Sequence, residues 1–309
     1  MRILFIGIGS IGKRHLMNLR ELLTLKNIEF SIDALRTVAA PLDDELASAL
    51  SHVFYDMAEI EGEYDAVFIT NPSSLHYRTL KSIIPFAKAV FIEKPVFINP
   101  DEDIDSLGLR ENAIYYVACP LRFSPVVQKM KRIAQGSRVI SARAICSSYL
   151  PEWRRMDYRL SYSARRDMGG GVRLDLIHEM DYLLDIFGSP DRLVGVSSKY
   201  SDLEISCEDL ACYILSYGDK LISLHLDYTG RAPRREFELF TVDETLSGDI
   251  LKNRISFLKA GTEEMPAAAD IHKREMAYFL DLLEGKVENI NDIQRAADTL
   301  KYALMQEDI

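Results

Sequence analysis

The sequence predicts an α/β fold of two domains, a parallel sheet covered by helices and then an α+β domain with a mostly antiparallel sheet. Its 309 residues exceed one ordinary domain of about 100–200 residues. Over the first 120 residues, short apolar runs alternate with segments of helical period, which is typical of βαβ units. After residue 120, short alternating runs follow one another with turn residues between them. We therefore expect one domain over residues 1–120 and a second over residues 121–309.

The N-terminal part supplies a series of apolar runs of strand length. The first run ends in a glycine-rich turn, and leucines at helical spacing follow it. Because these runs lack polar alternation, we expect their strands to be buried on both faces. We predict strands at Arg2–Ile8, Glu29–Leu35, Asp65–Thr70, Ala89–Ile92 and Ala113–Ala118, and a helix at His15–Leu25.

The C-terminal part mixes helices with a meandering sheet. The segment Tyr217–Lys220 separates two alternating runs and is typical of a hairpin turn. Antiparallel strands joined in this way form most of the expected sheet. We predict helices at Pro125–Ala134, Val172–Phe187, Ala267–Leu283 and Ile293–Met305, a strand at Val139–Ile145, and short strands from Leu193 to Leu258.

Composition and charge exclude several classes of partner. Lys plus Arg total 37 and Asp plus Glu total 47, and the net charge of −10 argues against a nucleic acid or a membrane surface as partner. The sequence has no uncharged apolar run of about 18 residues, and its glycine-rich, basic start does not resemble a signal peptide. The four cysteines form no C-x-x-C pair, so we expect no metal site and no disulfide framework. We expect a cytoplasmic protein.

A glycine fingerprint follows the first predicted strand. Gly7, Gly9 and Gly12 form G-x-G-x-x-G before the first helix, with Ser10 and Ile11 in the turn. In this context the glycines permit a tight turn, the approach of a pyrophosphate to the backbone, and close packing of helix on strand. The phosphates then rest on N–H groups at the helix N-terminus. We therefore predict a Rossmann dinucleotide-binding domain; the alternative is a glycine-rich turn without a ligand.

The end of the second strand bears on the choice of cofactor. An acidic residue there usually holds the ribose 2′-hydroxyl group. Asp33, however, lies inside the predicted strand, and the tip carries Arg36 and Thr37. An arginine and a hydroxyl suit a 2′-phosphate better, so we expect NAD or NADP with a preference for NADP. The alternative is that Arg36 is a solvated loop residue.

Four further motifs resemble one family. Phe68–His76 contains Asn-Pro followed by His, and Phe91–Pro95 contains Glu-Lys-Pro. Leu121–Pro125 reads L-R-F-S-P, and Gly169–Asp181 contains three glycines, then Asp and His. With the glycine loop, this order resembles the glucose–fructose oxidoreductase and inositol dehydrogenase family, Gfo/Idh/MocA. The resemblance implies an NAD(P)-dependent oxidoreductase acting on CH–OH groups, whose cofactor is contacted by Asn71, Pro72, His76, Glu93 and Lys94.

The chemistry that this resemblance implies needs a base and a cationic donor. The base takes the hydroxyl proton while the hydride leaves the carbon, and histidine titrates in a suitable range. A lysine offsets the charge of the developing alkoxide. By resemblance, we expect His178 to be the base, Lys94 its cationic partner, and Asp175 the third catalytic residue.

The spacing of Asp175 and His178 supports a shared site. They lie three residues apart, where many family members have four, and so share one face of the predicted helix. The three glycines ahead of the helix permit the close approach of a ligand. The alternative is that both residues, with Tyr182 and Asp185, form the solvated face of an amphipathic helix.

An arginine-rich stretch precedes that helix. Six arginines and no lysine lie between Pro151 and Asp175, and a guanidinium group binds carboxylate or phosphate bidentately. The stretch resembles a family branch linked to bacterial surface-sugar pathways. We expect a sugar-type small molecule with an anionic group; the alternatives are arginines paired with surface acids and loop packing of the tyrosine. The expected substrate contacts are Arg122, Tyr158 and Arg159.

Together these observations predict hydride transfer between NAD(P) and a secondary hydroxyl of a sugar derivative. Two other functions stay open: a non-catalytic dinucleotide-sensing regulator, expected to lack Lys94 or His178, and an enzyme that recycles NAD during glycoside cleavage or epimerisation. We also expect a homo-oligomer, a dimer or tetramer. The strand Leu210–Leu215 carries apolar residues on both faces, and helices cover only one of them.

Overall fold

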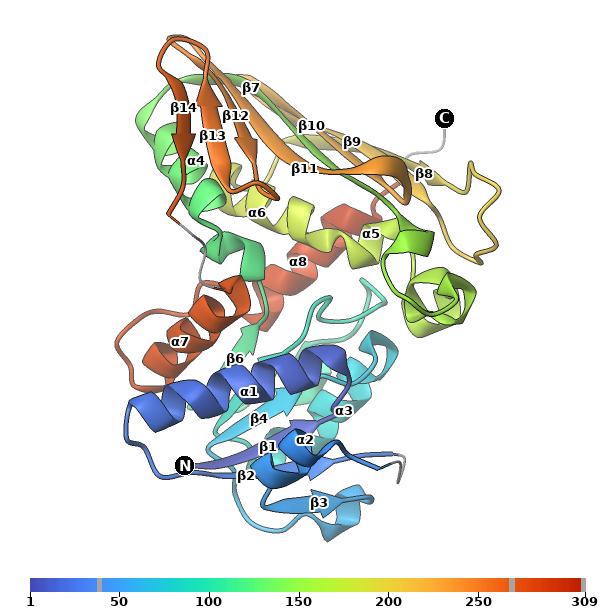
Figure 1. The fold of residues 1–309 in the computed structure, drawn as a ribbon, viewed down its shortest axis with the longest axis vertical. Coiled ribbons are helices and arrows are strands. Elements are labelled where there is room, and N and C mark those ends of the chain that lie inside the picture. Colours follow the sequence, from blue (N-terminus) through green and yellow to red (C-terminus); the bar gives the residue numbers. More distant parts are fainter. Residues whose placement is uncertain (38–40, 267–269, 307–309) are drawn as a thin grey trace. The chain divides into compact units, whose positions relative to one another are not determined.

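The computed structural model describes residues 1–37, 41–266 and 270–306, which form two compact units (Figure 1). The first unit contains residues 1–118 and 272–297, and the second contains residues 119–271 and those from 298 onward. The expected boundary at residue 120 lies close to this break, but residues 272–297 do not belong to the expected second domain. The reason is aromatic packing: Phe279 meets Phe68 and Phe91 edge-on, with ring centroids 5.5 and 5.2 Å apart.

The first unit holds a six-stranded parallel sheet in the order β3-β2-β1-β4-β5-β6, with helices around it (Figure 1). This is the Rossmann order, and it confirms the predicted parallel sheet. The edge strand β3 and the helix α2 after β2 were not predicted, because both are too short to carry a periodic pattern. The elements are β1 (Arg2–Ile6), α1 (Ser10–Leu25), β2 (Ser31–Leu35), α2 (Asp44–Ala49), β3 (His52–Phe54), β4 (Ala66–Ile69), α3 (His76–Ile83), β5 (Ala89–Ile92), β6 (Ile114–Val117), α7 (Ile271–Leu283) and the start of α8 (Ile293–Leu304), whose residues from 298 onward belong to the second unit.

The register of this sheet aligns the ends of its central strands. Ile6 of β1 pairs with Ile69 of β4, and Ile69 pairs with Ile92 of β5. All three side chains are almost fully buried, as expected for strands covered on both faces. The loops that follow β1, β4 and β5 therefore leave the sheet at one common edge.

The second unit is built on an eight-stranded sheet in the order β14-β13-β12-β11-β7-β10-β9-β8. Every neighbouring pair is antiparallel except β7 with β10, which confirms the predicted mostly antiparallel sheet. Its elements are α4 (Pro125–Gly136), β7 (Val139–Tyr149), α5 (Val172–Asp175), α6 (Ile177–Phe187), β8 (Arg192–Ser198), β9 (Leu210–Tyr217), β10 (Lys220–Asp227), β11 (Thr229–Thr241), β12 (Thr245–Asp249), β13 (Arg254–Phe257) and β14 (Gly261–Glu264).

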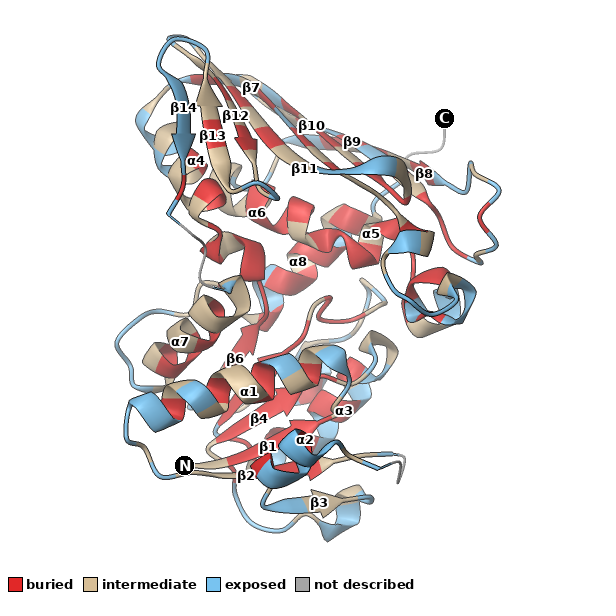
Figure 2. Cartoon of the chain, in the orientation of Figure 1, coloured by how far each residue is buried: buried red, intermediate tan, exposed pale blue. Residues whose placement is uncertain are grey.

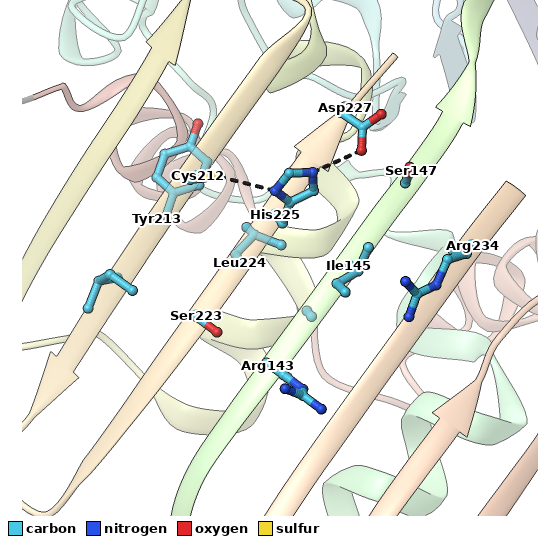
Figure 3. Close-up of a pocket in the computed structure, with 12 residues that line it drawn as sticks. Arg143, Ile145, Ser147, Cys212, Tyr213, Ser223, Leu224, His225, Asp227 and Arg234 are labelled. Carbon is cyan, nitrogen blue, oxygen red and sulfur yellow. Dashed lines mark hydrogen bonds and ion pairs between the residues drawn. The ribbon is translucent and has the colours of Figure 1, made fainter. Parts of the chain in front are cut away.

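Along the central strands of this sheet, buried residues alternate with exposed or half-buried ones (Figure 2). Along β9, Ala211, Tyr213 and Leu215 are buried on the face that α4, α5 and α6 cover, whereas Cys212 and Ile214 are exposed. Figure 3 shows the opposite, open face, to which residues of β7, β9, β10 and β11 contribute. The strand thus has the two-sided character that the sequence predicted.

The expected helix Val172–Phe187 is divided into α5 and α6. Leu176 separates them, with φ of −99° and ψ of 21°. Asp175 therefore ends one helix and His178 lies in the first turn of the next, so their relation is not that of residues i and i+3 on one continuous helix. Among the described residues, no helix is long and apolar enough to cross a membrane.

Candidate active site

The glycine loop forms an open cradle at the N-terminus of α1. Gly7 has φ of +87°, and a Cβ atom there would lie 2.7 Å from the backbone of Asn71. A Cβ atom on Gly12 would lie 2.6 Å from the carbonyl oxygen of Gly7, which shows how closely helix and strand pack. Gly9 caps α1, and a Cβ atom there would meet nothing within 4 Å. The N–H groups around Ser10–Ile11 thus border open space, which fits a pyrophosphate.

The loop after β4 braces this cradle. The Thr70 hydroxyl donates a hydrogen bond to the carbonyl oxygen of Gly7. Asn71 donates from Nδ2 to Thr79 Oγ1 at 2.8 Å, while its buried Oδ1 has no hydrogen-bond partner within the described chain. A buried amide oxygen without a donor is rare and points to a group that the protein alone does not supply. Asn71 and the exposed Pro72 beside it therefore fit the expected cofactor contacts.

His76 supports the cradle from inside and is fully buried. Its Nδ1 lies 2.9 Å from the carbonyl oxygen of Pro95, and its Nε2 lies 3.0 Å from that of Asn71. Burial lowers its pKa, so the ring is neutral at physiological pH. The expected direct contact of His76 with a cofactor does not fit this burial; the ring links the loops after β4 and β5.

Glu93 also contacts other residues of the first unit. Its carboxylate forms an ion pair with the fully buried His15 on α1, and its second oxygen accepts a hydrogen bond from the Lys94 N–H at 3.1 Å. Burial alone would raise the pKa of Glu93, but His15 outweighs this and holds the pKa at about 2. Glu93 therefore fastens α1 to the end of β5 and fixes the backbone of the half-buried Lys94. This arrangement leaves its carboxylate no direct role toward a cofactor.

The tip of β2 carries Arg36 and Thr37, as the sequence predicted. The N–H of Arg36 donates to the carbonyl oxygen of Phe54 at 3.0 Å, and Thr37 is exposed. Asp33 lies within β2, where its buried carboxylate accepts a hydrogen bond from the Tyr64 hydroxyl at 2.8 Å. Asp33 is therefore engaged away from the tip and does not take the place of a ribose contact there.

In the second unit, Asp175 is buried at the end of α5. The Tyr228 hydroxyl donates to its Oδ2 at 2.7 Å, and Trp153 packs edge-on against the Tyr228 ring at 5.2 Å. Burial and the adjacent Asp175 carboxylate raise the pKa of Tyr162. The guanidinium group of Arg154 lies 5.3 Å from the centre of the Tyr162 ring. These contacts form one cluster at the end of α5, made of the Asp175 carboxylate, the phenol groups of Tyr228 and Tyr162, and the Arg154 guanidinium group.

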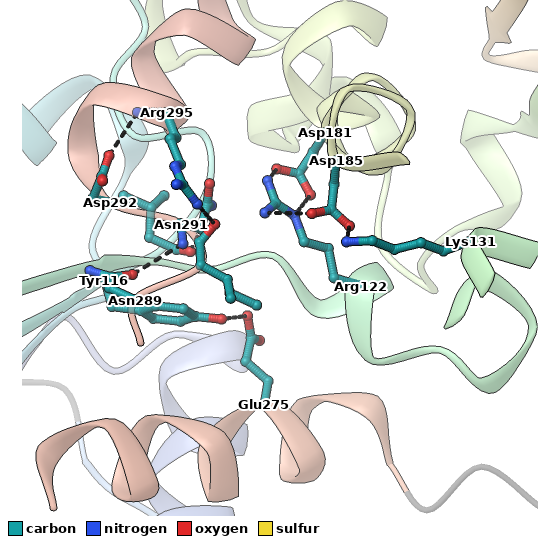
Figure 4. A network of polar contacts seen from close by, with 12 residues as sticks. Tyr116, Arg122, Lys131, Asp181, Asp185, Glu275, Asn289, Asn291, Asp292 and Arg295 are labelled. Carbon is teal, nitrogen blue, oxygen red and sulfur yellow. Dashed lines mark hydrogen bonds and ion pairs between the residues drawn. The ribbon is translucent and has the colours of Figure 1, made fainter. Parts of the chain in front are cut away.

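The half-buried His178 lies in the first turn of α6, and two ion pairs fix that helix. Arg122 binds Asp181 through Nε at 2.9 Å and Nη2 at 2.7 Å (Figure 4). Arg235 Nε lies 2.8 Å from the completely buried carboxylate of Glu179. The helix is therefore held on one side to the loop after residue 118 and on the other to β11.

The expected substrate contacts are engaged by the protein itself. The Arg122 side chain is 8% exposed and also lies 3.3 Å from Asp185, so its role in the structure is to anchor α6. Arg159 is exposed and pairs with Asp157 and Glu204. The Tyr158 hydroxyl accepts a hydrogen bond from the Glu204 N–H at 3.1 Å, which is loop packing. These positions do not support the direct contacts that the motifs suggested.

The three glycines at residues 169–171 make room for neighbouring parts of the chain and not for a ligand. A Cβ atom on Gly170 would lie 2.2 Å from the carbonyl oxygen of Tyr162. A Cβ atom on Gly171, whose φ is +117°, would lie 2.5 Å from Glu208 Oε1. The expected close approach is therefore that of the preceding loop and of Glu208 to the start of α5.

Sequence reasoning missed three parts of the site. Tyr228 lies more than fifty residues from Asp175 along the chain, and no motif surrounds it. The role of Trp153 depends on its packing against Tyr228 and could not be predicted either. The partnership of His15 with Glu93 was missed too, although the histidine follows the last fingerprint glycine by three residues. In the described residues, no group of three or more His, Cys, Asp or Glu could hold a metal ion.

The Rossmann topology and the open glycine cradle define a dinucleotide-binding protein. Residues 1–109 match the model of the oxidoreductase family with an NAD-binding Rossmann fold, Gfo/Idh/MocA. This match covers the first domain and confirms the resemblance of its motifs to that family.

Two curated relatives show the extent of the likeness. The UDP-N-acetylglucosamine 3-dehydrogenase of Acidithiobacillus ferrooxidans is 24% identical over 289 residues, which cover 89% of this chain and 84% of that protein. The uncharacterized oxidoreductase YrbE of Bacillus subtilis is 27% identical over 188 residues. That match covers 60% of this chain and only 53%, about half, of the relative.

Solved structures share the fold over nearly the whole chain. The Acidithiobacillus enzyme, GnnA, has a TM-score of 0.78 at 21% identity and covers 98% of this chain and 95% of its own. Levoglucosan dehydrogenase with NADH and levoglucosan has a TM-score of 0.79 at 17% identity, covering 98% and 94%. The WlbA dehydrogenase of Bordetella pertussis with NADH and UDP-GlcNAcA has a TM-score of 0.76 at 18% identity, covering 97% and 93%. Both domains therefore have the fold of known dehydrogenases.

Proposed function

We propose that this protein transfers a hydride between NAD(P) and a secondary hydroxyl group of a sugar derivative. One observation carries the proposal: the aligned ends of β1, β4 and β5 bring the glycine cradle, Asn71 and Lys94 to a common edge. Open α/β sheets bind their ligands at this edge. Two similar proteins are named UDP-N-acetylglucosamine 3-dehydrogenase and levoglucosan dehydrogenase, which supports a sugar-type substrate.

Each catalytic residue has a defined task in this proposal. The bound nicotinamide supplies the hydride acceptor. Lys94 places a positive charge beside the oxygen that loses its proton, and His178 takes that proton as the general base. Asp175, held by Tyr228, accepts a hydrogen bond from a substrate hydroxyl and orients the sugar. Glu93 and His76 are positioning residues that act through Lys94 and Asn71.

We propose that NADP is preferred over NAD. Arg36 and Thr37 follow the last residue of β2, where the ribose 2′-position is read in Rossmann domains. The only carboxylate of β2, on Asp33, is turned to Tyr64. A guanidinium and a hydroxyl at this position favour a 2′-phosphate.

We propose that the substrate carries a carboxylate or phosphate group, and that Arg154 contacts it. Arg159, Arg165 and Arg173 are paired with acids of this chain, whereas Arg154 stacks on Tyr162. Tyr162 in turn lies beside Asp175, so Arg154 is directed toward the proposed substrate site. The name of the WlbA complex, which contains UDP-GlcNAcA, supports an acidic sugar.

We propose a homo-oligomer, a dimer or tetramer, that covers the open face of the second sheet. On this face Ile214 is 41% and Leu221 is 47% exposed, while Val194 and Val196 of β8 are half-buried. Apolar strand residues that no helix covers favour a second copy of the chain. We also propose a cytoplasmic location, which fits the four free cysteines.

A substrate screen tests the function. Sugars, sugar acids and nucleotide sugars are each incubated with NAD or NADP, and the absorbance of the reduced nicotinamide is followed. We expect turnover of at least one acidic or nucleotide-linked sugar. Failure of every sugar with both cofactors would contradict the proposal, and reduced cofactor that copurifies without exchanging would favour an enzyme that recycles it. Light scattering at micromolar concentration tests the oligomer, which a monomer mass would exclude.

A further inference from the structure

The Tyr162 side chain touches the carboxylate that the proposed function assigns to a substrate hydroxyl group. Tyr162 begins a short 3₁₀ helix, Tyr162–Ala164, in the loop before α5. Its hydroxyl donates a hydrogen bond to Asp175, which also accepts the hydrogen bond from Tyr228. Burial, followed by the charge of Asp175, raises the pKa of the Tyr162 phenol, so the phenol stays a protonated donor at physiological pH. One carboxylate therefore serves two phenols of the chain itself.

The neighbours of Asp175 differ in their access to solvent. Asp175 itself is 6% exposed and Tyr228 is completely buried, whereas Tyr162 is 36% exposed. Cys207, whose thiol pKa is raised in part by the charge of Asp175, is 1% exposed. Of these three neighbours, Tyr162 is the one that reaches the surface. On the side of Tyr162, the path from solvent to the carboxylate therefore passes its ring.

The main chain after Tyr162 is fixed, whereas the outer face of its ring meets one exposed side chain. The Ser206 N–H donates to the carbonyl oxygen of Ala164 at 2.9 Å, and Ser163 and Ala164 are both buried. On the outer face, the guanidinium group of the exposed Arg154 lies 5.3 Å from the centre of the ring. A rotation of the Tyr162 side chain can therefore uncover Asp175 without a rearrangement of buried main chain.

We propose that Tyr162 determines the specificity of this site as a gate, whose hydroxyl holds Asp175 and is displaced by a hydroxyl group of the sugar. The inference rests on the proposed function, in which Asp175 binds the substrate. The displacement exchanges one hydroxyl–carboxylate hydrogen bond for another of the same kind, so a ligand with a hydroxyl donor replaces the phenol at little cost. A ligand without a donor leaves the carboxylate unsatisfied and is rejected.

The first experiment measures the contact of Tyr162 with Asp175 and needs no sugar. The full-length protein is labelled with 3-fluorotyrosine, and Tyr162→Phe identifies the ¹⁹F signal of Tyr162. We expect this phenol to titrate at a higher pH than N-acetyl-3-fluorotyrosinamide, and its pKa to fall toward that reference in Asp175→Asn, because the negative charge is lost. The same pKa in both proteins would overturn the proposal. If Asp175→Asn does not fold, a wild-type pKa no higher than that of the reference would overturn it.

The second experiment uses the sign of the change in KM. For each sugar that the substrate screen finds to be turned over, Tyr162→Phe should lower KM about tenfold, because the phenol no longer competes for Asp175. A tyrosine that merely contacts the substrate would give the opposite sign, since its loss raises KM. Tyr200→Phe, which alters a phenol that is 64% exposed, is the matched control and should keep the wild-type KM. An unchanged or raised KM in Tyr162→Phe would overturn the proposal.

The two experiments distinguish a failure of the gate from a failure of the proposed function. If no sugar is turned over, the proposed function fails, and the fluorine titration still decides whether Tyr162 holds Asp175. If sugars are turned over but Tyr162→Phe raises KM, the function stands and the gate is wrong. A lower KM together with a pKa of Tyr162 that depends on Asp175 supports both.

Discussion

The Tyr228 hydroxyl donates a hydrogen bond to Asp175 at 2.7 Å, and this contact joins the turn between β10 and β11 to the end of α5. Both groups are buried, so the carboxylate is fixed by a donor that solvent cannot replace. Trp153 packs against the phenol and restricts its motion. The contact thus sets the direction in which Asp175 presents its second oxygen.

Replacing Tyr228 with Phe should therefore lower kcat about tenfold or more, because Asp175 loses the donor that orients it. The unfolding free energy should fall by about 1–3 kcal/mol, because a hydrogen bond to a buried carboxylate is lost. Tyr213→Phe is the matched control, since that buried hydroxyl donates to the Ala303 carbonyl oxygen instead. Steady-state kinetics and urea unfolding of both variants check this. An equal loss of kcat in the two would show that stability alone is involved.

Lys94→Ala and His178→Ala should each lower kcat about 10²–10⁴-fold. The reason is that, in the reaction we propose, Lys94 stabilises the developing alkoxide and His178 removes the proton. Neither residue belongs to the glycine cradle, so dinucleotide binding should stay nearly unchanged in a fluorescence titration.

The controls are Lys88→Ala and His52→Ala, exposed residues of the first unit, which should keep wild-type turnover. Wild-type turnover in both active-site variants on an identified substrate would contradict the catalytic assignment.

The local motifs of the first unit could be predicted from sequence because their chemistry is local. Gly7, Gly9 and Gly12 lie close together in the sequence and can be recognised as one motif. The structure gives each glycine the expected surroundings. His76 and Glu93 were recognised as motif residues, but their burial depends on partners on other elements. A sequence motif marks a conserved position of a family and does not tell whether the side chain faces a ligand or the core.

The parts of the chain that are held by contacts distant in sequence were less predictable. The position of residues 272–297 follows from Phe279, whose aromatic partners precede it by about two hundred residues. The break at Leu176 leaves no periodic signal, because the apolar residues continue across it. The ion pair of Arg122 with Asp181 likewise could not be predicted without the fold, since the sequence around either residue does not indicate the other.

The cofactor preference can be reversed at one position. Arg36→Asp should weaken NADP binding and make NAD the better ligand, because a carboxylate repels the 2′-phosphate. Titration of intrinsic fluorescence with each dinucleotide measures both affinities. Arg20→Asp, a charge change of the same size on α1, should leave the ratio unaltered. Tighter binding of NAD by the unmodified protein would reject the preference.

Glu93→Gln should destabilise the first unit by about 3–5 kcal/mol, because a buried ion pair with His15 loses one partner. The folded-state pKa of Glu93 is lowered from 4.5 to about 2. Its stabilisation is therefore fully present above about pH 4.5 and is lost as the pH falls toward 2. Urea unfolding should show the difference from wild type shrinking over that window.

Glu63→Gln is the surface control for this pair. Its carboxylate is half-exposed near Lys88 and Arg110, so the change should cost only about 0–1 kcal/mol. A Glu93→Gln protein as stable as Glu63→Gln at neutral pH would show that the buried pair does not hold α1 to β5.

Arg154→Ala should raise KM far more for an acidic sugar than for its neutral analogue. The guanidinium lies over the ring of Tyr162, which interacts with Asp175. We propose that it binds the carboxylate or phosphate of the substrate as a planar fork. Loss of such a charged contact corresponds to about a tenfold rise in KM or more. Because Arg154 does not touch the reacting atoms, kcat at saturating substrate should change little.

Arg165→Ala and Arg159→Ala test whether the effect belongs to this arginine or to the whole stretch. Both side chains are exposed and paired with nearby acids, so each should leave KM for the acidic sugar close to that of the wild type. A rise in KM for Arg159→Ala alone would return the anion contact to that residue. Equal effects of Arg154→Ala on the KM of acidic and neutral sugars would mean that Arg154 shapes the pocket through its stacking on Tyr162. The charge of Arg154 would then contribute nothing to substrate binding.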